Sequence, residues 1–492
     1  MSGAVGTGGA ARIGGNILAL LGARVVSVVF SFVQASVIVS SLGPVGMGHF
    51  SYAWGLTSLL TIFATLGVRR VLIRDIARRP EETWTLVWTA TAMVVVLSAM
   101  VLLLVFLAEY GLDGNAPRRA AVMVAVLWIV VLWAWQQPFE AILMARERMI
   151  LAGVLQVIVA VLKVASVYWF LSVGSTGADA HGALLLANVL GLGLFVLAAI
   201  RIEGWAPPRF DLAALWRLIA ECRPMLAAAI LAVVYFKSDI VLLSWLRGDE
   251  ATGIYGAVQR ISEPLSMMAG VLGTALFPAL CRYSAGASDN FALLRRTSAR
   301  LVLIVSMPMA FGLAAVADPV IGLLARDRAA EFALSVTVLQ IACGVIPFFY
   351  FNGIAMEFLY ANDENWFVVR TYACAAAVSV VGNLIAVSLW GVLAVPCVAI
   401  VVNAMISVMY YVKLRNALRE ARLLTLTLKT TIACGLMGGL AWWIAGHSLI
   451  AALASGALVY PLLQLAMGAL SPLERQLMRR VTQTVTRRLG MP

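Results

Sequence analysis

Residues 84–107 read WTLVWTATAMVVVLSAMVLLLVFL, a stretch of 24 residues without a charged side chain. About 20 apolar residues in a helix are enough to cross the hydrocarbon layer of a membrane. A helix is also the one single-segment structure that satisfies its own backbone polar groups in lipid. The stretch therefore predicts a transmembrane helix.

Similar apolar stretches recur along all 492 residues, of which 62% are hydrophobic and only 12% are charged. Soluble domains carry about 25% charged residues. We therefore predict an all-α polytopic membrane protein with about 14 transmembrane helices and almost no soluble domain. The predicted spans are 16–41, 50–67, 84–107, 119–140, 150–173, 181–200, 224–246, 254–280, 299–324, 332–357, 366–389, 391–413, 426–446 and 448–468.

The basic residues alternate between dense and sparse connecting segments. With the N-terminus inside, 27 of the 36 lysines and arginines fall in inner segments and 5 fall in outer ones. Because cytoplasmic loops are enriched in these residues, the pattern predicts that both termini are cytoplasmic. The net charge of +12 is then explained by topology, and a nucleic-acid partner is disfavoured.

Two predicted inner segments, 68–79 and 473–488, are basic and amphipathic. In the first, one helical face carries four apolar side chains opposite the arginines: Val68, Val71, Leu72 and Ile76. Such helices lie in the membrane interface, so we expect both segments to anchor the protein in membrane lipids.

Two turns resemble each other at an offset of 205 residues. Residues 40–53 read SSLGPVGMGHFSYA and residues 244–257 read SWLRGDEATGIYGA, which aligns Gly48-x-Phe50 with Gly253-x-Tyr255. Both turns join an outgoing helix to an ingoing one, which predicts a parallel pseudo-repeat of six helices. The predicted parts are an N-terminal lobe at 12–205, a C-terminal lobe at 206–415, two appended helices at 416–470 and an amphipathic cytoplasmic tail at 471–492.

Six charged residues lie well within predicted spans, and four of them are basic: Arg24, Lys163, Lys237, Asp239, Arg260 and Glu263. A charge at the bilayer centre costs about 2.5–3.5 kcal/mol on insertion scales, so each should face a partner or a water-filled cavity. The excess of basic residues favours an anionic ligand, with Arg24, Lys163 and Arg260 as candidates. The alternative is that these charges only hold helices together.

Helices 7 and 8 should form an antiparallel hairpin that places Asp239 level with Arg260, and Lys237 level with Glu263. Residues 237 and 239 point about 200° apart on a helix, so both ion pairs cannot form cleanly. We predict the Asp239–Arg260 pair. Pro264 leaves a carbonyl without its helical donor, which predicts a kink that acts as a hinge.

Catalytic chemistry is disfavoured. The three histidines, His49, His181 and His447, fall singly at outer helix ends, where we expect surface residues. The outer loops are short, and no acidic pair, Walker motif, metal site or cofactor motif is evident. Energy would have to come from an ion gradient, the membrane potential or the lipid's own gradient, with H⁺ or Na⁺ binding at Asp239 or Glu263 left open.

Two stretches resemble one known family, the Wzx-type oligosaccharide-lipid flippases. Residues 41–78 are similar to the first hairpin of that family. Residues 237–283 are similar to its helix 7–8 hairpin, in which an acidic residue, a G-x-Y turn and a late proline recur, here as Asp239, Gly253-x-Tyr255 and Pro278. ANDENW before helix 11 and WGVLAVP before helix 12 fit the later hairpins.

The resemblance implies a fold like that of the multidrug and toxin extruders, which belong to the same multidrug, oligosaccharidyl-lipid and polysaccharide (MOP) exporter superfamily. It also implies the flipping of a polyprenyl-(pyro)phosphate-linked oligosaccharide across the cytoplasmic membrane. Arg24, Lys163 and Arg260 are the cationic residues that match. A drug or metabolite antiporter and a peptidoglycan-precursor flippase remain alternatives. We expect a monomer and leave open an association with the polysaccharide polymerase machinery.

Overall fold

The computed structural model describes the backbone of residues 7–111, 116–174, 176–284, 289–362, 364–418 and 423–468. Within these ranges the side chains are described except at 7–25, 70, 110–111, 223–225, 227–228, 266–284, 289–295, 361, 416–418 and 423–424. Arg24, Pro278 and the predicted tail at 471–492 therefore lie outside the residues whose side chains are described.

Helices account for nearly all of the described backbone. In chain order they are α1 (Thr7–Thr65), α2 (Val68–Arg78), η1 (Pro80–Glu82), α3 (Thr83–Gly111), α4 (Ala116–Ala125), η2 (Val126–Leu132, a π-helix), α5 (Trp133–Ala145), α6 (Met149–Val173), α7 (Gly177–Glu203), α8 (Leu212–Ser284), α9 (Asp289–Ala315), α10 (Ala317–Ala325), η3 (Arg326–Phe332), α11 (Ala333–Cys343), α12 (Ile346–Ala361), α13 (Asn365–Trp390), η4 (Gly391–Leu393), α14 (Ala394–Leu418), α15 (Leu423–Ala445) and α16 (Leu449–Ala466).

The predicted helix count is confirmed. In the part of the chain that the structure describes, 10 segments are long and apolar enough to span a membrane, and one bent pair makes an eleventh. Three of these segments, Val26–Thr65, Ala229–Leu265 and Asn365–Arg415, each contain a glycine that breaks the helix and so hold two of the predicted spans. The protein is an all-α polytopic membrane protein with 14 such helices.

The chain reverses inside α1 and α8 at single glycines. Gly43 has φ 65° and ψ −179°, and Gly248 has φ 80° and ψ −172°. Residues with a β-carbon scarcely adopt these angles, so glycine is required at both places. The new helices begin directly after these turns rather than at the predicted residues 50 and 254, because one glycine completes the reversal.

The two turns are related by the same offset of 205 residues, which supports the predicted repeat. We call the helical parts that follow Gly43 and Gly248 the second arms of α1 and α8. Directly after the two turns, these second arms approach each other closely. A β-carbon on Gly48 would collide with the backbone carbonyl of Asp249, and one on Gly253 would collide with the carbonyl of Pro44. A shift of 205 residues converts one contact into the other. We call this contact the glycine seam.

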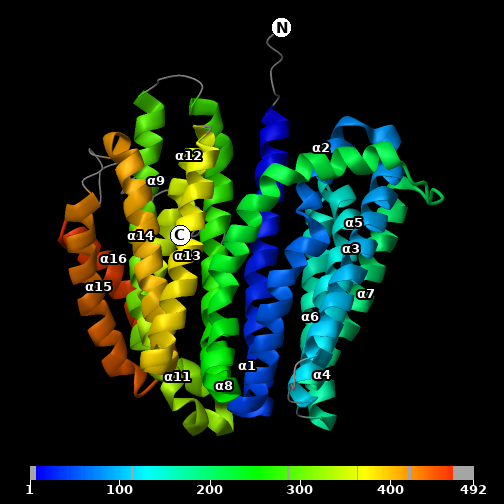
Figure 1. The fold of residues 1–492 in the computed structure, drawn as a ribbon. Coiled ribbons are helices and arrows are strands. Elements are labelled where there is room, and N and C mark those ends of the chain that lie inside the picture. Colours follow the sequence, from blue (N-terminus) through cyan, green and yellow to red (C-terminus); the bar gives the residue numbers. More distant parts are fainter. Residues whose placement is uncertain are drawn as a thin grey trace. The chain divides into compact units, whose positions relative to one another are not determined.

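The helices form two compact units. Among the described residues, the first unit lies within Met1–Ile261, Leu324–Phe332 and Tyr372–Val395, and the second within Ser262–Leu323, Ala333–Thr371 and Pro396–Pro492. In the first unit α3, α5, α6 and α7 lie side by side (Figure 1), and α6 packs along α1. The predicted division into lobes at residue 206 stays a prediction.

The amphipathic helix α2 carries its apolar side chains on one face, as predicted. Val68, Leu72 and Ile76 are fully buried, and they belong to a core formed with α3, α5 and the first turns of α8. The expectation that this face anchors in lipid is therefore wrong, because protein already covers it. The arginines on its charged face form ion pairs with other parts of the protein.

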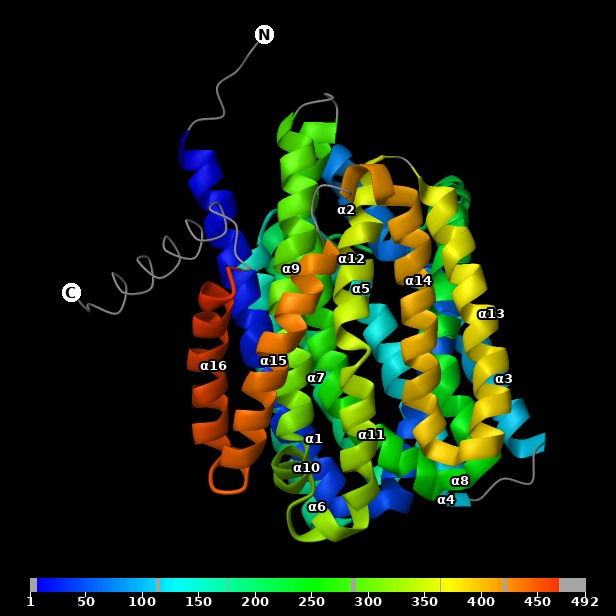
Figure 2. The same cartoon turned by 90° about the vertical axis from the view of Figure 1, so that its left-hand side faces the viewer.

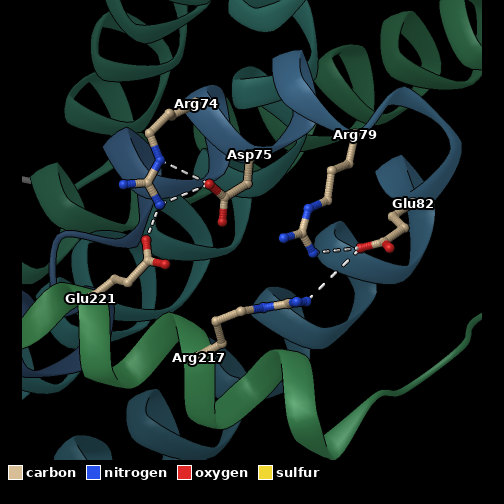
Figure 3. A network of polar contacts seen from close by, with 6 residues as sticks. All are labelled: Arg74, Asp75, Arg79, Glu82, Arg217 and Glu221. Atoms are coloured by element: carbon tan, nitrogen blue, oxygen red, sulfur yellow. Dashed lines mark hydrogen bonds and ion pairs between the residues drawn. The ribbon is translucent and has the colours of Figure 1, made fainter.

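Ion pairs connect α2 and η1 to the beginning of α8 (Figure 3). Arg74 bonds both Asp75 and Glu221, and Glu82 lies 3.5 Å from Arg79 and 3.9 Å from Arg217. Exposed pairs of this kind contribute little individually. They join the first turns of α8 to α2 and η1 at the surface of the first unit.

The second unit is held by α9, α12, α15 and α16. Figure 2 shows α9, α15 and α16 as neighbours, which the contacts among these helices confirm. Tyr460 of α16 is buried and donates a hydrogen bond of 2.6 Å to the carbonyl of Ile304 in α9. In α14, Asn403 accepts a 3.0 Å hydrogen bond at its backbone carbonyl from the buried Asn352 of α12.

The glycine seam leads to a test of stability. Gly253→Ala places a methyl group against the backbone of Pro44, which cannot move aside without separating the two arms. Overpacking of this kind costs about 1–3 kcal/mol. We expect purified Gly253→Ala to melt at a lower temperature than the unmodified protein in fluorescence-detected thermal unfolding.

The matched control is Gly353→Ala in α12, where a β-carbon would meet no atom within 4 Å. Alanine is also the better helix former, so this variant should melt at the same or a higher temperature. Equal melting temperatures for the two variants would show that the seam is not closely packed.

Candidate functional site

Arg260 lies on an aromatic wall made by the second arm of α1. Its Cζ atom is 4.7 Å from the ring centroid of Phe50 and 4.7 Å from that of Trp54. The two aromatic residues are one helical turn apart, so both rings reach the same guanidinium. Aromatic faces are electron-rich and attract a cation, more strongly where water is excluded. The glycine seam brings α8 close enough for this contact.

His181 of α7 packs against Phe50, one of the two residues of this aromatic wall. Its ring stacks on Phe50 with centroids 4.3 Å apart and planes at 15°. Trp128 donates its indole N–H to Nδ1 of His181 at 3.1 Å, and Nε2 lies 3.1 Å from the carbonyl oxygen of Phe50. Because Nδ1 accepts, the proton must be on Nε2, which donates to that carbonyl. The imidazole is therefore neutral, with both nitrogens engaged.

Lys163 of α6 reaches the same group of aromatic residues. Its Nζ atom lies 5.6 Å from the ring centroid of Trp128, and Trp128 lies 5.3 Å from Trp54. Two of the three predicted cationic residues, Lys163 and Arg260, are thus brought to the two ends of one tryptophan pair. We call the set Phe50, Trp54, Trp128, His181, Lys163 and Arg260 the cation–aromatic cluster.

The remaining predicted residues are placed as follows. Asp239 accepts a 2.5 Å hydrogen bond from the hydroxyl of Tyr255, the aromatic residue of the repeat motif. Lys237 is half-buried in α8, and Glu263 and Pro264 follow Arg260 in the second arm of that helix. The Asp239–Arg260 pair and the hinge at Pro264 stay predictions, as does the role of Arg24, whose side chain is not described.

Two of the three histidines differ from expectation. His181 is fully buried and His49 is 7% exposed, whereas His447 is exposed as predicted. The prediction for His49 and His181 was wrong because a position near a helix end does not imply exposure when other helices cover that end. Each of the two has specific polar partners, which lets it be buried.

A polar cluster closes the end of the glycine seam. His49 bonds Asp249 at 3.2 Å, and Arg118 of α4 lies 3.5 Å from the other carboxylate oxygen of Asp249. Arg118 also lies 3.7 Å from the ring centroid of Tyr52. The α8 turn is thereby tied to both α1 and α4.

A second buried carboxylate was missed by the sequence analysis because it falls at the end of a predicted span. Glu140 of α5 accepts hydrogen bonds at one oxygen from Arg69 at 2.7 Å and from Gln156 of α6 at 3.1 Å. The side chain of Glu140 is only 8% exposed. The signal that could have identified it was the group of polar side chains near the end of this apolar span, namely Gln136, Gln137 and Glu140.

Solved structures share this fold. A lipid II flippase, MurJ, in an inward closed conformation aligns with a TM-score of 0.71 at 11% identity, covering 91% of this chain and 97% of that chain. An inward-facing multidrug resistance MATE family transporter of the MOP superfamily aligns with a TM-score of 0.64 at 13% identity, covering 82% and 99%. The MATE transporter VcmN of Vibrio cholerae, in its bent form, gives 0.52 at 15% identity, covering 84% and 99%. The fold is thus shared with the lipid II flippase and with the MATE transporters.

The family follows from the sequence itself. The model of the polysaccharide biosynthesis protein family matches residues 13–284, and that of the MatE family matches residues 224–385. The first match covers more than half of the chain, which therefore belongs to the polysaccharide biosynthesis protein family. No curated protein matches the chain. The predicted superfamily is confirmed, and the families and structural relatives are transporters rather than enzymes.

The ion pair of Arg69 with the buried carboxylate of Glu140 leads to a second test. Glu140→Ala removes the acceptor of both Arg69 and Gln156, and the loss of a charged hydrogen bond costs about 1.5–3 kcal/mol. We expect a lower melting temperature in detergent. The control is Glu82→Ala, whose carboxylate is 43% exposed and pairs with exposed arginines, so its melting temperature should change little. A larger effect for Glu82→Ala would contradict this ranking.

Proposed function

We propose that the protein moves a polyprenyl-(pyro)phosphate-linked oligosaccharide from the inner to the outer leaflet of the cytoplasmic membrane, for the synthesis of a cell-surface polysaccharide. Its family and its superfamily fold support this task. The excess of basic residues in the predicted inner segments supports an orientation with both termini in the cytoplasm.

The observation that carries the proposal is the placement of Lys163 and Arg260 at the two ends of the Trp54–Trp128 pair. Cations held inside a membrane protein favour an anionic ligand, and the two phosphoryl groups of a lipid diphosphate offer one anion to each. Arginine also binds phosphate through two parallel N–H groups. Arg24 is proposed as a third cation of the same cavity.

Alternating access is the proposed mechanism. The two hairpins that meet at the glycine seam belong to repeat-related halves, and rocking of such halves around a central site exposes it to each side in turn. The cluster of His49, Asp249 and Arg118 would have to separate when that end of the seam opens. Asp239 and Glu263 are the proposed sites for a coupling H⁺ or Na⁺, with Lys237 as a nearby ion-pair partner.

A drug or metabolite antiporter is the second candidate, favoured by the MatE match at residues 224–385. Cationic drugs usually require an acidic cavity, whereas the cation–aromatic cluster presents two cations. A strain lacking the protein separates the two functions: accumulation of polyprenyl-linked oligosaccharide supports the flippase, and drug sensitivity without accumulation supports the antiporter. Loss of viability with accumulated peptidoglycan precursor would indicate a flippase for that lipid.

Replacing both Arg24 and Arg260 by alanine should abolish export while leaving membrane insertion intact. The single change Arg260→Ala should lower export on the order of 10- to 100-fold, the effect of losing a charged hydrogen bond to a phosphate. Surface polysaccharide and lipid-linked oligosaccharide are measured in a deletion strain that carries each variant at equal protein level.

The matched control is Arg148→Ala, which removes an exposed arginine between α5 and α6. This variant should export normally. Normal export by the Arg24, Arg260 double variant would overturn the proposed site, and equal losses in the control would show that total charge, not position, is what matters.

A further inference from the structure

We propose that the connection between α7 and α8 is a membrane anchor that inserts into the lipid interface and selects anionic phospholipid headgroups. We call residues 204–216 the interfacial connection; they comprise the segment after α7 and the first turns of α8. The distribution of basic residues predicts that it lies on the cytoplasmic side, so its partner is the inner leaflet. The inference is independent of the proposed function, because it uses none of the residues of the cation–aromatic cluster.

The interfacial connection exposes large apolar side chains outside the membrane spans. The described spans on either side of it are Gly177–Glu203 and Ala229–Leu265. Within the connection, four large apolar side chains are 57–61% exposed: Trp205, Phe210, Leu212 and Trp216. Apolar side chains gathered on one exposed segment mark a contact with a membrane or with a partner protein. The depth and the charges of the connection favour the membrane.

The depth of the connection follows from its contacts with the first two turns of α3. The ring centroid of Trp205 lies 5.8 Å from that of Trp88, whose indole N–H donates to the carbonyl of Ala206 at 3.3 Å. The backbone N–H of Asp211 donates to the hydroxyl of Thr89 at 3.2 Å. Thr89 lies about 9 Å along the axis from the first residue of α3. Interfacial segments lie about 5–10 Å into the boundary between headgroups and acyl chains, which matches this depth.

The first turns of α8 direct their charged face towards the protein. Ala214, Leu218 and Cys222 lie in the core of the first unit. Arg217 and Glu221 point towards η1 and α2 and form ion pairs there (Figure 3). A surface helix that faces water carries its charges on the side opposite the core. Here the charged face is engaged by neighbouring helices instead.

The outward face of these turns is apolar. Four exposed residues share it at helical spacing: Leu212, Ala213, Trp216 and Ala220. Figure 1 shows this part of α8, in green, crossing the ends of α3 and α5, with which it shares a core. Tryptophan is enriched at the membrane–water interface, where its amphipathic ring lies at headgroup level. An apolar outward face at this depth therefore fits lipid better than water.

Two exposed arginines flank the apolar side chains. Arg209 lies in the connection, and Arg201 lies in the last turn of α7. The nearby carboxylates are already engaged: Glu203 pairs with Arg146, and Asp211 accepts a 2.8 Å hydrogen bond from the backbone of the first turn of α8. Basic groups beside an interfacial segment attract anionic phospholipids. The charge of this surface is therefore complementary to an anionic leaflet.

The test measures whether the connection meets lipid or water. Bimane is attached to Trp216→Cys in full-length protein that also carries Cys374→Ser and Cys397→Ser, which removes the two described cysteines that are exposed. Each nanodisc holds one protein, so a second copy cannot cover the site. The fluorescence should be lost when the phospholipids carry a nitroxide at the headgroup end of the acyl chain, and retained with aqueous iodide.

The matched control is Glu81→Cys, which labels an exposed residue of η1 at the same end of the first unit. Its bimane should show the opposite pattern, with fluorescence lost to iodide and retained with the lipid nitroxide. Leu212→Cys labels the same face as Trp216→Cys and decides the question if the latter does not fold. The protein without an added cysteine gives the background fluorescence to subtract.

The headgroup preference is measured with the same label. Quenching at position 216 by nitroxide-labelled phosphatidylglycerol should exceed quenching by nitroxide-labelled phosphatidylcholine at equal content. Each basic residue near the surface changes this preference by up to about fivefold. The double variant Arg201→Gln, Arg209→Gln should therefore bring the ratio close to one. Arg326→Gln, which removes an exposed arginine of η3, should leave the ratio unchanged.

The outcomes separate the anchor from other uses of this face. Lipid quenching at positions 216 and 212, with a phosphatidylglycerol preference that depends on the two arginines, supports the proposal. Iodide quenching at both positions without lipid quenching would place the connection in water, and would overturn the anchor in favour of a partner protein that covers this face. Equal quenching by the two lipids in the protein with both arginines would overturn the selection of anionic headgroups.

Discussion

A guanidinium group within a membrane helix needs favourable surroundings, and Arg260 finds them on the faces of Phe50 and Trp54. Several elements of the first unit hold these two rings next to Arg260. The second arm of α1 must lie against α8, which requires the glycine seam. The rings must also be held in place, which His181 of α7 does for Phe50 and Trp128 of η2 does for Trp54. The faces of both rings are electron-rich and attract the guanidinium through a cation–π contact.

The internal repeat explains how two distant parts of the chain meet. Gly43 and Gly248 make the same backbone reversal, and Gly48 and Gly253 each pack on the turn of the other half. The symmetry is broken where the proposed site lies. The repeat equivalent of Arg260 is Gly55, which packs closely against Ile240 and carries no charge. A symmetric framework thus supports an asymmetric arrangement of cations.

The sequence was sufficient to predict the helices, their number and the charged residues within them, because hydrophobicity and the rarity of intramembrane charge are local signals. Depth within one hairpin could also be estimated by counting residues. That counting could not show that Lys163 and Arg260 share a tryptophan pair, since the members of the pair come from helices that are distant in the chain. His181 was missed for the same reason: its burial depends on Trp128 and Phe50. The apolar face of α2 was identified correctly, but its periodicity could not distinguish a protein core from lipid.

The central claim is that a lipid diphosphate binds at the cation–aromatic cluster. The most direct measurement is a cryo-electron microscopy structure of the protein in nanodiscs with a bound polyprenyl diphosphate oligosaccharide. The account predicts density for the diphosphate within hydrogen-bonding distance of the Arg260 guanidinium, with the second phosphoryl group directed towards Lys163. A well-defined diphosphate bound elsewhere, with no ligand density at Arg260 or Lys163, would contradict it.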